Sequence, residues 1–219
     1  MVQANAEIRA VLFDFGGVIT ESPFVAFRRF EQERGLPAGF LQRINRNNPD
    51  TNAWARHERS ELTPAQFDEA FAIESRAAGQ EVRGQDVINL LYGAIRPQML
   101  LAVSRCKAHY RTACLTNNMR HEGRHGLGAM PGRAREWSDA LSLFDQVVES
   151  SKIGARKPEP RFFERACETL SIDPREAVFL DDLGANLKPA RAMGMTTIKV
   201  GDPDDALAEL EQVLGIRLR

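Results

Sequence analysis

No apolar run in the sequence approaches the roughly 20 residues that a helix needs to cross a membrane. The first ten residues, MVQANAEIRA, contain no apolar signal core. Neither sign of charge is in excess, because 29 Lys and Arg side chains face 30 Asp and Glu side chains. This balance argues against a general nucleic-acid or membrane-surface binder, which needs a basic surplus. We therefore expect a cytoplasmic protein that uses neither a membrane nor nucleic acid as a partner.

Cysteine is scarce, and the three cysteines match no metal-binding spacing. Cys106 and Cys114 lie in apolar-rich stretches, which is typical of small core residues, and Cys167 stands alone. A reducing compartment is the default expectation for such a chain. Internal repeats and low-complexity tracts are also lacking. A chain of 219 residues with 43% hydrophobic content suffices for one large domain, or for a core with a small insert.

Five short apolar runs alternate with helical patterns and predict a parallel sheet. Their length and composition are typical of buried strands, and the third run is the weakest. The runs occupy residues 8–13, 112–116, 145–150, 177–182 and 196–200. Helical patterns occupy residues 97–110, 159–170, 186–194 and the segment from residue 204. This alternation implies right-handed crossovers, so we expect an α/β fold with a Rossmann-like, three-layer α/β/α parallel sheet.

Strand patterns are absent from about residue 21 to residue 96, where only helical spacing occurs. One of the helical stretches opens with a capping box, in which Thr63 precedes Pro64 and Gln66. We therefore expect an inserted helical domain over residues 21–96. The core would then consist of residues 1–20 and 97–219.

Polar side chains gather where the predicted strands end. Parallel strands bring their carboxyl ends to one edge of a sheet, where open α/β folds bind ligands. The polar residues at these ends are Asp14, Thr116, Asn117, Lys157, Asp181 and Asp182. Each one alone also fits a turn, a helix cap or a solvated loop charge. Four complementary strand ends together favour a single site.

These residue types suit phosphoryl transfer. A carboxylate such as Asp14 can take a phosphoryl group and release it to water in a second step. Because the attack brings two anions together, we expect Mg²⁺, held by the oxygens of Asp14 and Asp182. Thr116 and Asn117 can hold phosphate oxygens, and Lys157 can neutralise the nucleophile and the transferring group.

The motifs and their order resemble the haloacid dehalogenase-like (HAD) hydrolase superfamily. The matching segments are DFGGVIT (14–20), LTNN (115–118), SSKIGARKPEPRFF (150–163) and FLDDLGANLKPARAMGM (179–195). The last is similar in detail to the N-terminal phosphatase domain of soluble epoxide hydrolases and their bacterial relatives. The helical insert resembles the family's C1-type cap. The resemblance implies a magnesium-dependent phosphatase that acts on a small phosphorylated metabolite through an aspartyl-phosphate intermediate.

The resemblance also implies a role for each site residue. Asp14 would be the nucleophile, and Lys157 would stabilise the phosphate. The implied phosphate-binding residues are Thr116 and Asn117. The implied metal ligands are Asp14, the carbonyl of Gly16 and Asp182, with Asp181 acting directly, through water or as an orienting residue.

The sequence departs from the family pattern at Gly16, where the family's phosphatases usually carry a second Asp. That Asp protonates the leaving group and then activates water. General acid–base catalysis is worth about 10²–10⁴ in rate, so we expect slow or selective activity. Esters with good leaving groups, such as aryl, anomeric sugar or acyl phosphates, would be preferred. The candidate substitute acids are His57 and Glu58 in the insert, and His121 and His125 in a long loop expected over residues 118–137.

Three other functions stay open. A haloacid dehalogenase attacks carbon with the same Asp and needs no metal, but the adjacent Asp181 and Asp182 make sense mainly as a cation site. A phosphomutase hands the phosphoryl group to a bound sugar, and Gly16 counts against it. A binding or regulatory module that lost the reaction is favoured by Gly16 and opposed by the four retained motifs. The sequence carries no signal for the oligomeric state.

Overall fold

The computed structural model describes residues 7–118 and 134–219. Five strands form one parallel sheet in the order β3-β2-β1-β4-β5. The strands are β1 Ala10–Phe13, β2 Arg111–Thr116, β3 Gln146–Glu149, β4 Ala177–Asp181 and β5 Thr196–Lys199. All five expected strands are confirmed, and their ends lie within two residues of the expected ones.

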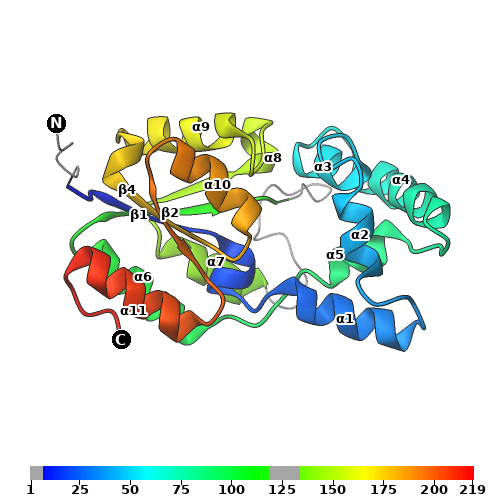
Figure 1. Ribbon diagram of the computed structural model, residues 1–219, viewed down its shortest axis with the longest axis horizontal. Coiled ribbons are helices and arrows are strands. Elements are labelled where there is room, and N and C mark those ends of the chain that lie inside the picture. The colour runs from blue at the N-terminus through cyan, green and yellow to red at the C-terminus, as the bar shows by residue number, and fades with distance from the viewer. Residues whose placement is uncertain (1–6, 119–133) are drawn as a thin grey trace.

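Helices cover both faces of the sheet, so the central strand β1 is fully buried. Side chains alternate between the faces, with Val11 and Phe13 in one core cluster and Ala10 and Leu12 in the other. The first face is covered by α6 Pro97–Lys107, α7 Ala134–Ser142 and α11 Pro203–Leu214. The second is covered by α9 Pro160–Leu170 and α10 Gly184–Ala192. Figure 1 shows α9 and α10 above the sheet, and α6 and α11 below it. The expected three-layer α/β/α architecture is therefore confirmed.

Two short helices complete this part of the chain, α8 Ser150–Ile153 after β3 and η3 Pro174–Glu176 before β4. The three cysteines are free and buried, as expected for Cys106 and Cys114. No helix in the described ranges has the length and apolar content needed to cross a bilayer.

The prediction of a loop over residues 118–137 is wrong at its C-terminal end, because α7 already begins at Ala134. Trp137 is buried there, and its ring packs edge-on against Phe15 and Tyr92, with ring centroids 4.8 and 5.3 Å away. This contact with residues distant in sequence anchors the first turn of α7. Residues 119–133 of the expected loop, with His121 and His125, lie outside the described residues.

Five helices between β1 and α6 form the insert. They are α1 Pro23–Glu33, α2 Phe40–Arg46, α3 Ala53–Glu58, α4 Pro64–Ala77 and α5 Gly84–Asn89. Their apolar faces, including Phe40, Phe67 and Phe71, make a core cluster separate from the two beside the sheet. The expected capping box is confirmed, since Gln66 N donates to Thr63 Oγ1 and Thr63 N donates to Gln66 Oε1. Figure 1 shows the insert beyond the carboxyl ends of the strands.

The chain enters and leaves the insert through two segments that run antiparallel. Glu21 N donates to Ala94 O and Arg96 N to Ile19 O, both at 2.8 Å. A Cβ at Gly93 would lie 2.4 Å from Glu21 O, so a glycine is needed for this close approach. The pairing begins soon after α5, which ends at Asn89.

We predict that Gly93→Ala lowers the free energy of unfolding by about 1–3 kcal/mol, because the added methyl group forces the two segments apart. Gly201→Ala is the matched control, since its Cβ would meet no atom within 4 Å; its effect should stay within about 0.5 kcal/mol. Urea unfolding of both variants measures the difference. Equal unfolding midpoints would contradict the close approach.

Candidate active site

Six of the seven predicted site residues line one cavity of about 720 Å³ between the sheet and the insert. They are Asp14, Gly16, Thr116, Asn117, Lys157 and Asp182. The seventh, Asp181, is fully buried and contacts Lys157. The sheet order explains this convergence, because it sets the ends of β1, β2 and β4 side by side.

Asp14 follows the last residue of β1 and is 7% exposed. Its Oδ1 accepts a hydrogen bond of 2.6 Å from Phe15 N, the first N–H of the turn η1, Phe15–Ile19. The turn is wide, because Thr20 N donates to the carbonyl of Phe15, five residues earlier. The nucleophile candidate is therefore held by the chain that follows it.

The two glycines of this turn differ in what they require. Gly17 has φ +84°, and a Cβ there would lie 2.3 Å from Asp182 Oδ2, so only glycine fits. Gly16 has φ −73° and ψ 119°, which any residue adopts, and a Cβ there would meet nothing within 4 Å. The position where the motif usually carries its second Asp is therefore open, and it borders the cavity.

Lys157 is 1% exposed, and its ammonium group lies between two carboxylates. Nζ is 2.7 Å from Asp14 Oδ1 and 2.8 Å from Asp181 Oδ2. Burial alone would lower the pKa of Lys157, but the two carboxylates outweigh it and raise that pKa above its ordinary value. The side chain is therefore a fixed cation beside Asp14.

Both oxygens of Asp181 already accept protein hydrogen bonds. Oδ1 accepts from Leu183 N at 2.8 Å, and Oδ2 accepts from Lys157 Nζ. The Asn186 amide donates to both oxygens at 3.0 Å. Sequence reasoning missed Asn186, although it lies within the fourth motif on the first turn of α10. These contacts fit Asp181 as an orienting residue.

Three carboxylates, those of Asp14, Asp181 and Asp182, bring oxygens within 4.8 Å of one another. Burial raises the pKa of Asp182 to about 6, and the negative charge of nearby Asp181 adds to this rise. Ser22 Oγ donates a hydrogen bond to Asp182 Oδ2 at 3.4 Å. Burial also raises the pKa of Asp14 well above its ordinary value, although Lys157 opposes the shift. One ammonium group thus faces three crowded acids. This all-oxygen, net negative donor set suits a divalent cation such as Mg²⁺.

The end of β2 supplies Thr116 and Asn117. Thr116 is 3% exposed, and the one contact of its hydroxyl within the described residues is a long one of 3.5 Å to the carbonyl of Asn117. The Asn117 side chain pairs with the backbone of Lys157: Nδ2 donates to Lys157 O at 2.9 Å, and Lys157 N donates to Oδ1 at 2.8 Å. The Asn117 amide therefore holds the loop that carries Lys157.

The candidate substitute acids lie in different places. His57 is 1% exposed, its Nδ1 is 3.0 Å from Leu62 O, and its ring stacks on Phe67 within the insert's core. It is not among the described residues that line the cavity. Glu58 does line the cavity. Aromatic residues form much of the insert's side of it, among them Phe24, Phe27, Trp54 and Tyr92.

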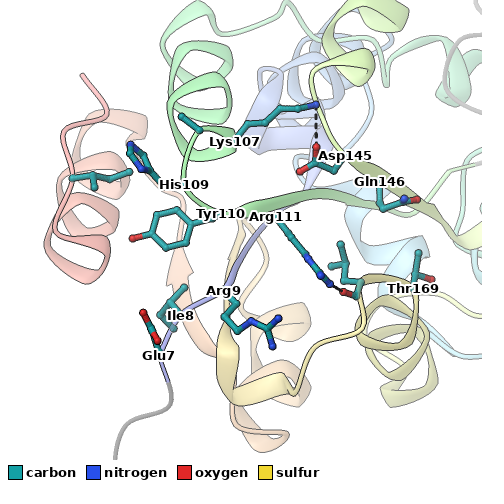
Figure 2. A pocket seen from close by; sticks show the side chains of 13 residues that line it. Glu7, Ile8, Arg9, Lys107, His109, Tyr110, Arg111, Asp145, Gln146 and Thr169 are labelled. Carbon is teal, nitrogen blue, oxygen red and sulfur yellow. Dashed lines mark hydrogen bonds and ion pairs between the residues drawn. The ribbon is translucent and has the colours of Figure 1, made fainter.

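A second hollow, of about 950 Å³, opens at the opposite edge of the sheet, where the strands begin (Figure 2). Three of its charged groups have partners: Lys107 pairs with Asp145 at 3.1 Å, and Arg111 donates to the carbonyl of Leu170. It contains none of the residues predicted from the motifs. The candidate site is therefore the cavity at the carboxyl ends.

Comparison with known proteins gives relatives over nearly the whole chain. It is 37% identical over 216 residues to mouse acyl-CoA dehydrogenase family member 10, covering 96% of this chain and 19% of that protein. It is 31% identical over 223 residues to pig bifunctional epoxide hydrolase 2, covering 96% and 40%. It therefore spans less than half of either relative. A sesquiterpene phosphatase of Aspergillus oryzae is 25% identical over 210 residues, covering 94% and 97%.

Solved structures share the fold. A HAD-like hydrolase from Porphyromonas gingivalis matches with a TM-score of 0.65 at 20% identity, covering 97% of this chain and 100% of that one. A HAD family enzyme from Bacteroides thetaiotaomicron, solved as a magnesium complex, matches with a TM-score of 0.58 at 25% identity, covering 89% and 95%. The same enzyme was solved with magnesium and inorganic phosphate; that structure matches at 22% identity, with a TM-score of 0.57 and coverage of 89% and 96%.

The family model for haloacid dehalogenase-like hydrolases matches residues 8–194. This range contains the four motifs, except for the last residue of the fourth, Met195, and every residue of the site described above. The chain belongs to the haloacid dehalogenase-like hydrolase family.

Proposed function

We propose that the protein is a magnesium-dependent phosphatase that hydrolyses a small phosphomonoester through an aspartyl-phosphate on Asp14. The observation that carries the proposal is the buried Lys157 ammonium between Asp14 and Asp181, with Asp182 beside them. The phosphatase relative and the neighbour that binds magnesium and phosphate support it. We assign residues 21–96 as a cap over a core of residues 1–20 and 97–219. A cytoplasmic location stays a prediction from the sequence.

In this proposal, the first step forms a bond between Asp14 and phosphorus while the ester P–O bond breaks. Lys157 Nζ and Phe15 N hold Asp14 Oδ1, so we assign Oδ2 as the attacking oxygen. Lys157 also offsets charge on the transferring group, and the Thr116 hydroxyl binds a phosphate oxygen. In the second step, water displaces Asp14 and releases phosphate.

The metal would be held by Asp14, Asp182 and the carbonyl of Gly16. When bound, it would offset the repulsion between the carboxylate and the phosphate and orient the phosphate for in-line attack. Asp181 would orient Lys157, because its own oxygens are already engaged. The cluster of three carboxylates supports this reaction over metal-free dehalogenation.

The open position at Gly16 supports a preference for good leaving groups. No side chain at this position can protonate the departing oxygen, so the leaving group must depart as an anion or take its proton from water. Aryl, anomeric sugar or acyl phosphates tolerate this better than alkyl phosphates. The lack of an acid at Gly16 also disfavours a phosphomutase, which needs an acid–base residue to transfer the phosphoryl group to a sugar.

We predict that Asp14→Asn abolishes turnover of p-nitrophenyl phosphate, because an amide cannot replace the attacking carboxylate. Beryllofluoride with magnesium should raise the melting temperature of the wild type and leave that of the variant unchanged. If the wild type shows no shift and the variant hydrolyses the ester normally, the phosphatase proposal fails.

We predict that Gly16→Asp raises the rate on a simple alkyl phosphate by up to about 10²-fold, because it restores a proton donor where space exists. The gain on p-nitrophenyl phosphate should be smaller, since that leaving group needs no proton and only the activation of water in the second step would benefit. Gly16→Asn, similar in size but without an acid, is the control and should accelerate neither. Equal wild-type rates on the two esters would refute the argument from the missing acid.

We predict that a chelator abolishes activity and that added magnesium restores it. The Mg²⁺ concentration for half-maximal activity should rise as pH falls below about 6, because protons then compete for Asp182, whose pKa is raised to about 6. Magnesium titrations at pH 7, 6 and 5 and constant ionic strength measure the effect. Activity that persists in chelator would contradict the metal assignment.

A further inference from the structure

The insert touches the core beside the catalytic lysine at a short run, Glu58–Ser60, at the C-terminal end of α3, and at Pro49, whose carbonyl accepts from Arg156 Nη1 at 3.1 Å. Glu58 is 6% exposed and borders the cavity. Its Oε1 accepts a hydrogen bond of 2.9 Å from Trp54 Nε1, within the insert. Its Oε2 accepts from Arg156 Nε at 2.5 Å and from Asn117 Nδ2 at 3.3 Å, both in the core. One buried carboxylate thus joins the two parts of the protein.

The two core partners of Glu58 are the residues that hold Lys157. Asn117 pairs with both backbone polar groups of Lys157, at 2.8 and 2.9 Å. Arg156 precedes Lys157 in the chain, and its guanidinium is largely buried against Glu58. Lys157 in turn contacts Asp14. The chain of contacts therefore runs from the insert through Glu58 to the ammonium group beside the proposed nucleophile.

The rest of the run docks on the same stretch of core. The Glu58 carbonyl accepts a hydrogen bond of 2.8 Å from Ser150 Oγ. Arg59 Nη1 pairs with Glu159 Oε1 at 3.1 Å, and Ser60 Oγ donates to Ser151 O at 3.1 Å. Contacts at both ends of residues 150–159 bracket Lys157, so docking of the insert bears directly on that segment.

The contacts of Glu58 do not suit the substitute acid suggested by the sequence. Both of its oxygens accept N–H donors, and one donor is a guanidinium. A proton on either oxygen would face a donor and disrupt the bond. The arrangement instead suits a carboxylate that neutralises Arg156, because a buried charge needs a partner.

We propose that Glu58 is a positioning residue: through Asn117 and Arg156 it makes the placement of Lys157 depend on the seating of the insert over the cavity. The inference rests on the proposed function and adds a condition to it. With the insert docked, Glu58 holds Asn117 and Arg156 in place. Lys157 then keeps its contact with Asp14. With the insert lifted, the segment that carries Lys157 loses its buried anion and its contacts with the Glu58 carbonyl, Arg59 and Ser60.

The test is Glu58→Gln, assayed on p-nitrophenyl phosphate and on a simple alkyl phosphate. The amide removes the charge and sets an NH₂ group or a neutral oxygen against Arg156. We expect kcat to fall by about 10²-fold, the loss that a misplacement of about 1 Å can cause. The loss should be equal on the two esters, and the shape of the pH–rate profile should not change. Glu69→Gln, the same change at an exposed acid on α4, away from the docking run, should have wild-type rates.

Two results would overturn the inference. A loss confined to the alkyl ester, with loss of the basic limb of its pH profile, would make Glu58 the acid. Wild-type kcat on both esters would show that Lys157 does not depend on Glu58. A wild type inactive on both esters would instead overturn the proposed function, and this inference with it.

A double-mutant comparison keeps the test decisive if Glu58→Gln is also less stable. Arg156→Gln and the double variant Glu58→Gln/Arg156→Gln are measured beside it, with unfolding midpoints for all three. If the pair acts through its contact, the double variant loses no more activity than the worse single variant. Additive losses would contradict the contact as the cause.

Discussion

The structure depends on one interaction, the buried ammonium of Lys157 between the carboxylates of Asp14 and Asp181. A charge at this depth is tolerated only when it is paired, and here two carboxylates flank one ammonium group. The interaction joins the end of β1, the end of β4 and the loop after β3. It can form only because the sheet order makes β1 and β4 neighbours. The parallel sheet is thus what gathers groups that lie far apart in the chain.

The same carboxylates that stabilise Lys157 leave an excess of negative charge. Asp182 is turned away from the ammonium group toward the cavity, where Gly17 allows it to approach the turn after β1. The site is therefore divided between an internally neutralised half, built on Asp181, and a half whose excess negative charge suits a cation. This division gives the adjacent acids different environments, although their side chains are identical.

Local pattern was enough to predict the strands and the four motifs. Burial makes strands apolar, and the polar residue that ends each one marks the sheet's functional edge. Asn186 was also within reach, since it lies on the helix that follows the acidic pair. The partners of Glu58 and the burial of Trp137 could not be predicted from the sequence. Both depend on how the insert and α7 dock. Sequence spacing carries no signal for contacts between residues about 60 to 100 positions apart, and so the role of Glu58 had to come from the coordinates.

The paired segments that connect the insert to the core have a mechanical consequence. Two antiparallel tethers, hydrogen-bonded at 2.8 Å, form a narrow ribbon that resists stretching but can twist along its length. Beside the end of the ribbon, Arg96 Nη1 donates to the carbonyl of Gly17 at 2.8 Å. A torsion of the insert would therefore reach the turn after Asp14 through the contact between Arg96 and Gly17. The insert is thus linked to this turn as well as to the segment that carries Lys157.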